Sequence, residues 1–315
     1  MMTKVVFYEV YEEEEAVLKK FLPRDFSADF FPKTIQEEGH TSPLAGVVSV
    51  RTQSVVPKAW ASSLKGVLTR SQGFDHMTAF LKTAGRNIPC GYLDNYCSRA
   101  VAEHVLMIMM TLLKRLKGQI KAFDRFRRSG IMGTELGGKN VLVVGVGCIG
   151  EEVARLVKGV WMNVKGVDIV PNKPDVKYTS LEEGVSWADI IVCALPLTES
   201  TEKLLNYKLL STAKPGVIFI NISRGEISPI ADMDRLLNEN IFAGVAMDVY
   251  EEEGKLAAYL RKGAGRGDKN AAIVERLKTQ DNVLFTPHNA FNTRESLERK
   301  AGQSIEALVH FFKEG

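Results

Sequence analysis

The glycine-rich stretch Gly145-Val146-Gly147-Cys148-Ile149-Gly150 constrains the fold of this chain more than any other feature. Mostly β-branched residues at 141–144 precede it, and residues 151–158 carry apolar side chains at helical spacing. In a dinucleotide site the first glycine permits the turn, the second lets the pyrophosphate approach and the third lets helix pack on strand. The helix N-terminus then offers N–H groups to phosphates. The motif alone is also compatible with ordinary turn chemistry, but its strand and helix context favours the dinucleotide.

Candidate strands alternate with helical segments along the whole chain, whose 315 residues suggest two domains. In the first part they lie at 5–10, 26–31, 46–50, 66–69 and 88–92. From the glycine turn onward they lie at 140–144, 162–167, 189–194, 217–221, 242–247 and 283–285. We therefore expect a small α/β unit followed by a six-stranded, doubly wound parallel sheet. Residues 98–128 are predicted to form one long helix between them.

The composition excludes several classes of protein. The formal net charge of +3 comes from scattered Lys and Arg, which argues against a nucleic-acid surface. Apolar stretches are far shorter than the roughly 20 residues that cross a bilayer, and the N-terminus does not resemble a signal peptide. The four cysteines show no C-x-x-C pair. We expect a cytoplasmic protein with no metal site and no membrane segment.

Asp168 ends the strand that follows the glycine turn, at the offset of roughly 20 residues where an acidic residue contacts the adenosine ribose. A carboxylate there accepts hydrogen bonds from the ribose hydroxyls and repels the additional phosphate of NADP. The sequence therefore favours NAD over NADP. The alternative is a carboxylate that merely ends a strand.

Three consecutive predicted strands end in residues suited to chemistry. Arg224 follows the first, Asp248 and the glutamates 251–253 follow the second, and His288 follows the third. An arginine can hold a carboxylate through two parallel hydrogen bonds, and a histidine can pass a proton near neutral pH. A neighbouring carboxylate would orient the histidine ring. Spacing alone does not tell which of the three glutamates contacts His288, and a solvated charge run is the alternative.

The chain resembles the D-isomer-specific 2-hydroxyacid dehydrogenase family over nearly its whole length. The resemblance rests on residues 137–141 with the glycine turn, on 214–225, on 244–250 and on Thr286-Pro287-His288. It implies that Arg224 binds substrate, that His288 is the acid/base and that Glu253 is its partner. It also implies a set of cofactor contacts: Gly145, Gly147, Cys148, Ile149, Gly150, Asp168, Leu195, Pro196, Thr201, Ile222, Ser223, Arg224 and Asp248.

Two segments resemble the D-lactate dehydrogenase branch of that family. One is the long stretch from Glu253 to Asn282, with a Gly/Arg/Lys-rich loop at 263–270, and the other is Asn289-Ala290-Phe291-Asn292-Thr293. Tyr96 matches a substrate-facing tyrosine, although its neighbours depart from the branch pattern. Arg51 has no clear counterpart and would suit a larger or doubly anionic acid. The candidate substrate contacts are Arg51, Gln72, Gly73, Tyr96 and Arg224, and ordinary loop positions are the alternative for those in the first unit.

The resemblance implies a Rossmann NAD-binding domain at 101–291 and a flavodoxin-like substrate domain at 1–100 and 292–315, in a homodimer. The expected reaction interconverts a small 2-keto acid and its D-2-hydroxy acid with NAD (NADH), pyruvate and D-lactate being the first pair. Alternatives within the family are glyoxylate/hydroxypyruvate, phosphoglycerate and phosphite dehydrogenases. A different class is an NAD-sensing corepressor on the same fold. The long segment after Glu253 argues against the other dehydrogenases of the family. The set Arg224, Glu253 and His288 argues against the corepressor.

Overall fold

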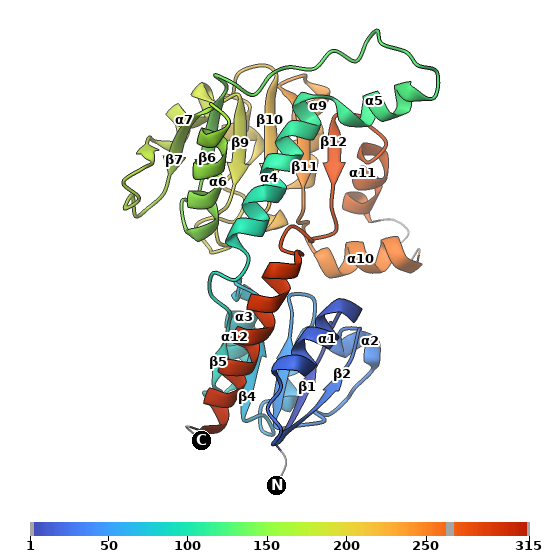
Figure 1. The fold of residues 1–315 in the computed structure, drawn as a ribbon, viewed down its shortest axis with the longest axis vertical. Coiled ribbons are helices and arrows are strands. Elements are labelled where there is room, and N and C mark those ends of the chain that lie inside the picture. Colours follow the sequence, from blue (N-terminus) through green and yellow to red (C-terminus); the bar gives the residue numbers. More distant parts are fainter. Residues whose placement is uncertain (1–2, 263–267, 314–315) are drawn as a thin grey trace. The chain divides into compact units, whose positions relative to one another are not determined.

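The computed structural model describes residues 3–262 and 268–313, and the chain divides into two compact units (Figure 1). Unit 1 comprises Met1–Cys97 and Asn292–Gly315, and unit 2 comprises Ser98–Phe291. Each is built on one parallel sheet, so the predicted doubly wound α/β architecture with a smaller second α/β unit is confirmed. Within the described residues, none of the helices combines the length and the apolarity that crossing a membrane requires.

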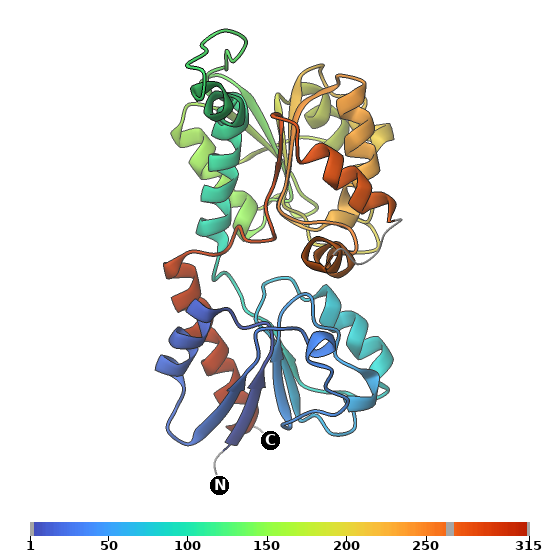
Figure 2. The same cartoon turned by 90° about the vertical axis from the view of Figure 1, so that its right-hand side faces the viewer.

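Unit 1 contains a five-stranded sheet of order β2-β1-β3-β4-β5. Its strands are β1 (Thr3–Phe7), β2 (Phe26–Phe30), β3 (Val47–Val50), β4 (Gly66–Thr69) and β5 (Cys90–Gly91). Its helices are α1 (Glu12–Phe21), α2 (Ile35–Glu38), the 3-10 turn η1 (Lys58–Trp60), α3 (Asp75–Ala84) and α12 (Arg294–Lys313). Figure 2 shows α1 and α12 on one face of the sheet and α3 on the other.

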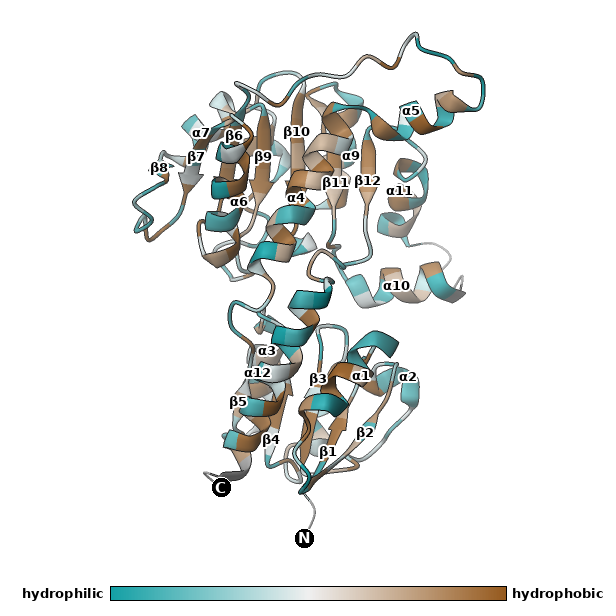
Figure 3. Cartoon of the chain, in the orientation of Figure 1, coloured by the Kyte–Doolittle hydropathy of each residue, from teal (hydrophilic) through white to brown (hydrophobic). Residues whose placement is uncertain are grey.

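The central strands of the unit 1 sheet are short apolar runs that are buried on both faces. β3 and β4 are buried along their whole length, as expected for parallel strands between helices. Trp60 and Phe80 close one face of this core. In Figure 3 the strands of both sheets are predominantly hydrophobic, whereas the helices alternate between hydrophobic and hydrophilic residues.

Unit 2 contains a seven-stranded parallel sheet of order β12-β11-β10-β9-β6-β7-β8. Its strands are β6 (Asn140–Val144), β7 (Asn163–Val167), β8 (Lys177–Tyr178), β9 (Ile190–Cys193), β10 (Val217–Asn221), β11 (Phe242–Met247) and β12 (Val283–Phe285). Its helices are α4 (Ser98–Leu113), α5 (Leu116–Phe123), α6 (Cys148–Gly159), α7 (Leu181–Trp187), α8 (Tyr207–Leu210), η2 (Gly225–Ile227), α9 (Ile230–Asn238), α10 (Glu253–Lys262) and α11 (Lys269–Leu277).

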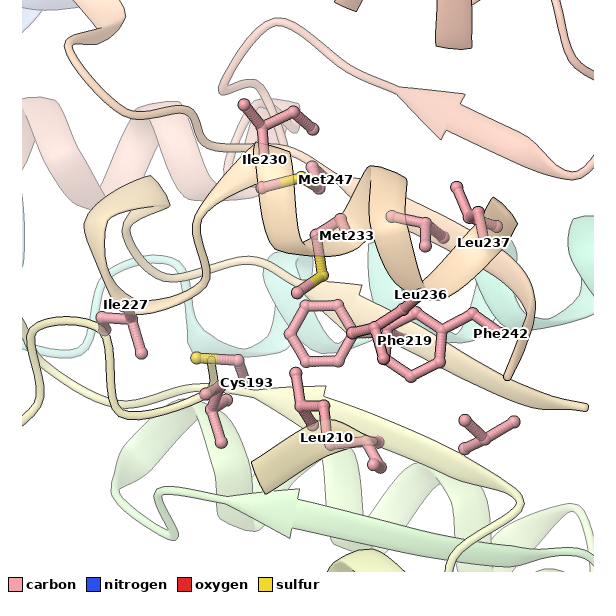
Figure 4. Close-up of a cluster of buried hydrophobic side chains, with 14 of the residues drawn as sticks. Cys193, Leu210, Phe219, Ile227, Ile230, Met233, Leu236, Leu237, Phe242 and Met247 are labelled. Carbon is pink, nitrogen blue, oxygen red and sulfur yellow. The ribbon is translucent and has the colours of Figure 1, made fainter. Parts of the chain in front are cut away.

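The core of unit 2 fixes the sheet between two helical layers. α4 and α6 pack together on one face. On the other, Phe219 and Phe242 stack with ring centroids 5.7 Å apart, and Leu210, Met233 and Leu236 belong to the same buried cluster (Figure 4). Burial of each such side chain contributes about 1.5–3 kcal/mol. The carboxyl ends of the strands are therefore carried on a rigid scaffold.

Two details differ from the sequence-based expectation, and one predicted segment lies partly outside the described residues. A seventh strand, β8, pairs with β7, but it is too short to show a hydrophobic period. The prediction of one continuous helix at 98–128 is wrong. It is interrupted at Arg115, which has a left-handed φ of 52°, and the Thr134 N–H instead donates to the Leu113 carbonyl. Residues 263–267 of the Gly/Arg/Lys-rich loop lie outside the described residues, whereas Asp268 caps α11.

Candidate active site

The glycine turn joins β6 to α6 beside the end of β9, where the strand order reverses direction. Gly145 has φ 93°, and a Cβ there would lie 2.7 Å from the Ala194 carbonyl carbon. At Gly150 a Cβ would lie 2.0 Å from the Gly145 oxygen. A Cβ at Gly147, in contrast, meets no described atom within 4 Å. The first and third glycines are thus required for packing, and the second leaves open space beside the N-terminus of α6, where Cys148 and Ile149 lie.

Asp168 lies next to this turn and holds it through hydrogen bonds. Its Oδ2 accepts a hydrogen bond from the Val146 N–H at 2.7 Å, and its Oδ1 accepts one from Val170 at 2.9 Å. The carboxylate is only partly buried. Each oxygen has a further lone pair, so Asp168 can accept from a ribose hydroxyl while it holds the loop.

The loops after β9 and β10 contain the other expected cofactor contacts and are tied to each other. The Ser223 hydroxyl donates to the Leu195 carbonyl, and its N–H donates to Asn221 Oδ1 at 2.9 Å. Thr201 donates from Oγ1 to the Pro196 carbonyl at 2.6 Å. These bonds fix the backbone beside the glycine turn. Ile222, which lies between Asn221 and Ser223, is buried at 8% exposed.

Arg224 follows β10 and is held by hydrogen bonds to Asn221 and Ser223. Its carbonyl accepts from Asn221 Nδ2 at 2.8 Å, and its Nη1 donates to the Ser223 carbonyl at 2.8 Å. The next residue, Gly225, leaves no room for a side chain, because a Cβ would lie 2.0 Å from the Tyr250 carbonyl carbon. The loop that carries Arg224 is therefore pressed against the loop after β11.

The three glutamates of that second loop have different roles. The Glu251 carboxylate accepts from the Ile230 N–H at 2.8 Å, at the start of α9, and burial raises its pKa. Glu252 pairs with Lys255 at the surface. Glu253 begins α10 and contacts His288. The ambiguity that the sequence left open is resolved geometrically, because the left-handed φ of 47° at Glu252 turns the chain between Glu251 and Glu253.

His288 and Glu253 form a close, partly exposed pair. His288 Nδ1 lies 2.8 and 3.0 Å from the two carboxylate oxygens, and the side chains are 21% and 19% exposed. With Nδ1 bound by the carboxylate, Nε2 is the ring nitrogen left to exchange a proton with a substrate. Nearby Asp248 is only 1% exposed, and its carboxylate accepts from the N–H groups of Asn289 and Ala290 at 2.9 Å. Its expected contact with nicotinamide stays a prediction.

The residues present fit a dinucleotide. Gly147 leaves space for pyrophosphate at the N-terminus of α6, and Asp168 has remaining acceptor capacity for a ribose. The loops containing Leu195 and Ser223 continue along the same edge of the sheet toward His288. A nicotinamide carried by this cofactor would supply hydride chemistry at that edge.

The expected substrate contacts in the first unit have well-defined surroundings. Arg51 follows β3, is 6% exposed and lies over the Tyr11 ring at 4.5 Å. Gln72 accepts from Cys97 Sγ at 3.7 Å, and the Gly73 carbonyl accepts from Ser71. Tyr96 is 3% exposed, and burial raises the pKa of its phenol. The three segments belong to unit 1, whereas Arg224, Glu253 and His288 belong to unit 2.

Sequence reasoning missed a buried ion cluster in unit 1. Glu14 of α1 lies 3.0 Å from Arg70 Nε and 2.7 Å from Lys300 Nζ of α12, and all three side chains are at most 1% exposed. Burial alone raises the pKa of Glu14, but the charges of Arg70 and Lys300 outweigh it and lower that pKa. Burial, aided by the charge of Arg51, lowers the pKa of Lys300 to about 7. One sequence signal could have indicated the burial of Glu14: it lies four residues before Leu18 and so on the same face of the helix.

A second missed residue is Glu9, which follows β1 with a left-handed φ of 57°. Its carboxylate accepts from the N–H groups of Arg51, Gln53 and Ser54 at 2.9 to 3.1 Å. Arg70 Nη2 in turn donates to the Glu9 carbonyl and to that of Tyr8. The loop after β3, with Arg51 in it, is therefore held through its backbone.

A parallel sheet with a glycine turn at its switch point and a histidine–carboxylate pair at the same edge defines a dinucleotide-dependent dehydrogenase. Residues 105–290 match the model of the D-isomer-specific 2-hydroxyacid dehydrogenase NAD-binding domain. The chain is similar to a D-lactate dehydrogenase of Treponema pallidum, with 32% identity over 79% of this chain and 76% of the relative. It is also 34% identical to a 2-hydroxyacid dehydrogenase homologue of Haemophilus influenzae, over 82% and 78% of the two chains.

Solved structures agree in fold along nearly the whole chain. The D-lactate dehydrogenase of Aquifex aeolicus, complexed with NAD and lactic acid, superposes with a TM-score of 0.87 and 28% identity, over 98% of this chain and 96% of that one. The chain therefore belongs to the D-isomer-specific 2-hydroxyacid dehydrogenases and resembles their D-lactate dehydrogenase branch. It is an NAD-dependent enzyme that acts on small 2-hydroxy acids.

Proposed function

We propose that the chain reduces pyruvate to D-lactate with NADH, and catalyses the reverse reaction. The observation that carries this proposal is the His288–Glu253 contact at the same sheet edge as Arg224. The D-lactate dehydrogenases among its relatives support pyruvate as the keto acid. The long segment after Glu253, which forms α10 and α11, resembles that branch as well.

Each of the three residues has a chemical role in this reaction. Arg224 holds the substrate carboxylate and directs its guanidinium toward the neighbouring carbonyl. His288, as imidazolium, donates the Nε2 proton to the carbonyl oxygen as the alcohol forms. Glu253 binds Nδ1, which fixes the ring orientation and stabilises the positive charge before transfer. NADH, when bound along the glycine turn, would supply the hydride.

We also propose that NAD is preferred over NADP. Asp168 lies beside the glycine turn, and its negative charge would face a 2′-phosphate. Lys173 is close in sequence, but its Nζ pairs with Glu151 at 2.7 Å. The carboxylate therefore dominates recognition at this point.

Steady-state kinetics with NADH tests the substrate. The panel contains pyruvate, glyoxylate, hydroxypyruvate, phenylpyruvate and oxaloacetate, each assayed at several concentrations to separate kcat from KM. We expect the highest kcat/KM for pyruvate. A higher value for another acid would replace the substrate, and tight NAD binding without turnover on any acid would indicate an NAD-sensing binding protein.

We further propose a homodimer in the cytoplasm. Exposed apolar side chains follow one another on α4, on α5 and just after it, namely Met107, Met110, Ile120, Phe123 and Phe126. Phe123 is 74% exposed and its ring centroid lies 6.4 Å from that of Phe126, and exposed apolar groups of this kind support an association surface. Sedimentation velocity should show a dimer that Phe123→Asp converts to a monomer. A wild-type monomer at micromolar concentration would contradict this.

A further inference from the structure

His104 on α4 is a partly buried histidine that has no role in the site described above. Its side chain is 15% exposed, and its Nε2 lies 3.2 Å from the hydroxyl of Thr286, which immediately follows β12. Asp248 Oδ1 lies 4.0 Å from the same nitrogen. All three residues belong to unit 2, and Thr286 lies two residues before His288.

The directions of the hydrogen bonds define the state of this histidine. Thr286 Oγ1 donates to Asp248 Oδ1 at 2.6 Å, and an ionised carboxylate can only accept. The hydroxyl has one proton, so toward His104 its oxygen accepts, and Nε2 carries the hydrogen. Burial lowers the pKa of His104, partly opposed by the charge of Asp248. The geometry therefore makes Nε2 of His104 the donor toward Thr286.

The same carboxylate holds the turn that carries the acid/base. Asp248 accepts from the N–H groups of Asn289 and Ala290, the two residues after His288. Tyr250 donates to the Thr286 carbonyl at 2.8 Å, on the other side of the turn. His288 itself has a left-handed φ of 52°, a conformation that costs about 1–3 kcal/mol and persists only where its surroundings enforce it.

We propose that His104 is a positioning residue for the reaction: by donating to Thr286 it fixes the hydroxyl on Asp248, and so the turn that aims the His288 ring. The inference rests on the proton-transfer role proposed for His288. Without the donor at 104, Thr286 can rotate its hydroxyl away, and Asp248 loses one of the partners that orient it. The carboxylate then holds the two amides less rigidly, and the ring departs from its productive orientation.

Two substitutions at residue 104 separate positioning from packing. His104→Leu fills the space of the ring with an apolar side chain and removes the N–H donor. His104→Gln retains an N–H donor. We expect kcat for the best keto acid to fall about 10- to 100-fold in His104→Leu, since a 1 Å misplacement can cost about 100-fold. His104→Gln should recover most of the loss. The melting temperature and the NADH dissociation constant should stay near wild type in both variants.

Thr286→Val tests the route of the coupling without altering α4. If the effect passes through Thr286, the double variant His104→Leu/Thr286→Val is no slower than the slower single variant. His310→Leu, which replaces an exposed histidine of unit 1, is the control and should leave kcat unchanged. Multiplicative effects in the double variant, equal loss in the Leu and Gln variants, or near-normal turnover in His104→Leu would overturn the inference. A preference for a keto acid other than pyruvate would only change the assay substrate.

Discussion

The carboxyl ends of the two sheets carry similar charged residues but use them differently. In unit 1, Arg70 and Glu14 are buried and paired with Lys300. In unit 2, His288 and Glu253 remain about one fifth exposed, although they are also paired. The charges of the unit 1 cluster are shielded from water and hold the fold, whereas the partly exposed pair of unit 2 can exchange a proton. Exposure, rather than residue type or place in the topology, separates the structural edge from the reactive one.

The largest expected effect is at the reactive edge. His288→Asn should lower kcat by about 10²- to 10⁴-fold, the usual contribution of a general acid, because an asparagine amide cannot donate the proton. The melting temperature should change little. Stopped-flow NADH oxidation with the best keto acid measures the effect, and Glu253→Gln should give a smaller loss. Near-normal turnover of His288→Asn would remove the chemical role from this edge.

At the structural edge, Glu14→Gln should destabilise unit 1 by about 3–5 kcal/mol, because it leaves the Arg70 charge buried without a carboxylate. Trp60 reports on this unit once Trp161 and Trp187 are replaced by Phe, so its fluorescence during urea unfolding gives the free energy of unfolding. Exposed Glu15→Gln on the same helix is the matched control. Equal stability of the two variants would show that the buried cluster contributes nothing.

The buried cluster of unit 1 should also make the free energy of unfolding depend on pH, through Lys300. The folded-state pKa of Lys300 is about 7, below its ordinary value of 10.5, through burial and the charges of Arg51 and Arg70, against the pull of Glu14. Between these two values the unfolded chain binds more protons, so the free energy of unfolding should rise with pH by on the order of 1 kcal/mol per unit. It should rise less in Lys300→Met. Identical slopes from about pH 7 to about pH 9 would contradict the lowered pKa.

The smallest of these effects concerns cofactor choice. Asp168→Asn should lower kcat/KM for NADH about 10-fold, as expected for loss of a hydrogen bond to a charged group, and should lessen the discrimination against NADPH. The asparagine can still accept from Val146 and so keep the loop in place. Paired kinetics with both cofactors measures the ratio. An unchanged ratio would leave the carboxylate with only its structural role in the turn.

Much of the fold and part of the site were predictable because they rest on local patterns. The glycine turn, the apolar strand runs and the residues directly after β10, β11 and β12 are all contiguous features. Glu14 and Lys300 could not be paired from the sequence, since α1 and α12 are brought together only by packing. The break at Arg115 and the choice of Glu253 depend on single left-handed residues, for which propensity gives no signal.

Gly225 packs the two loops of the reactive edge tightly against each other. Its α-carbon packs against the Tyr250 backbone so closely that the loops after β10 and β11 leave no room for a side chain between them. A side chain at residue 225 would therefore push the two loops apart and displace both Arg224, which is proposed to hold the substrate, and Glu253, which contacts His288. Redesign of substrate preference at this edge must treat the two loops as one unit, with residue 225 left unvaried.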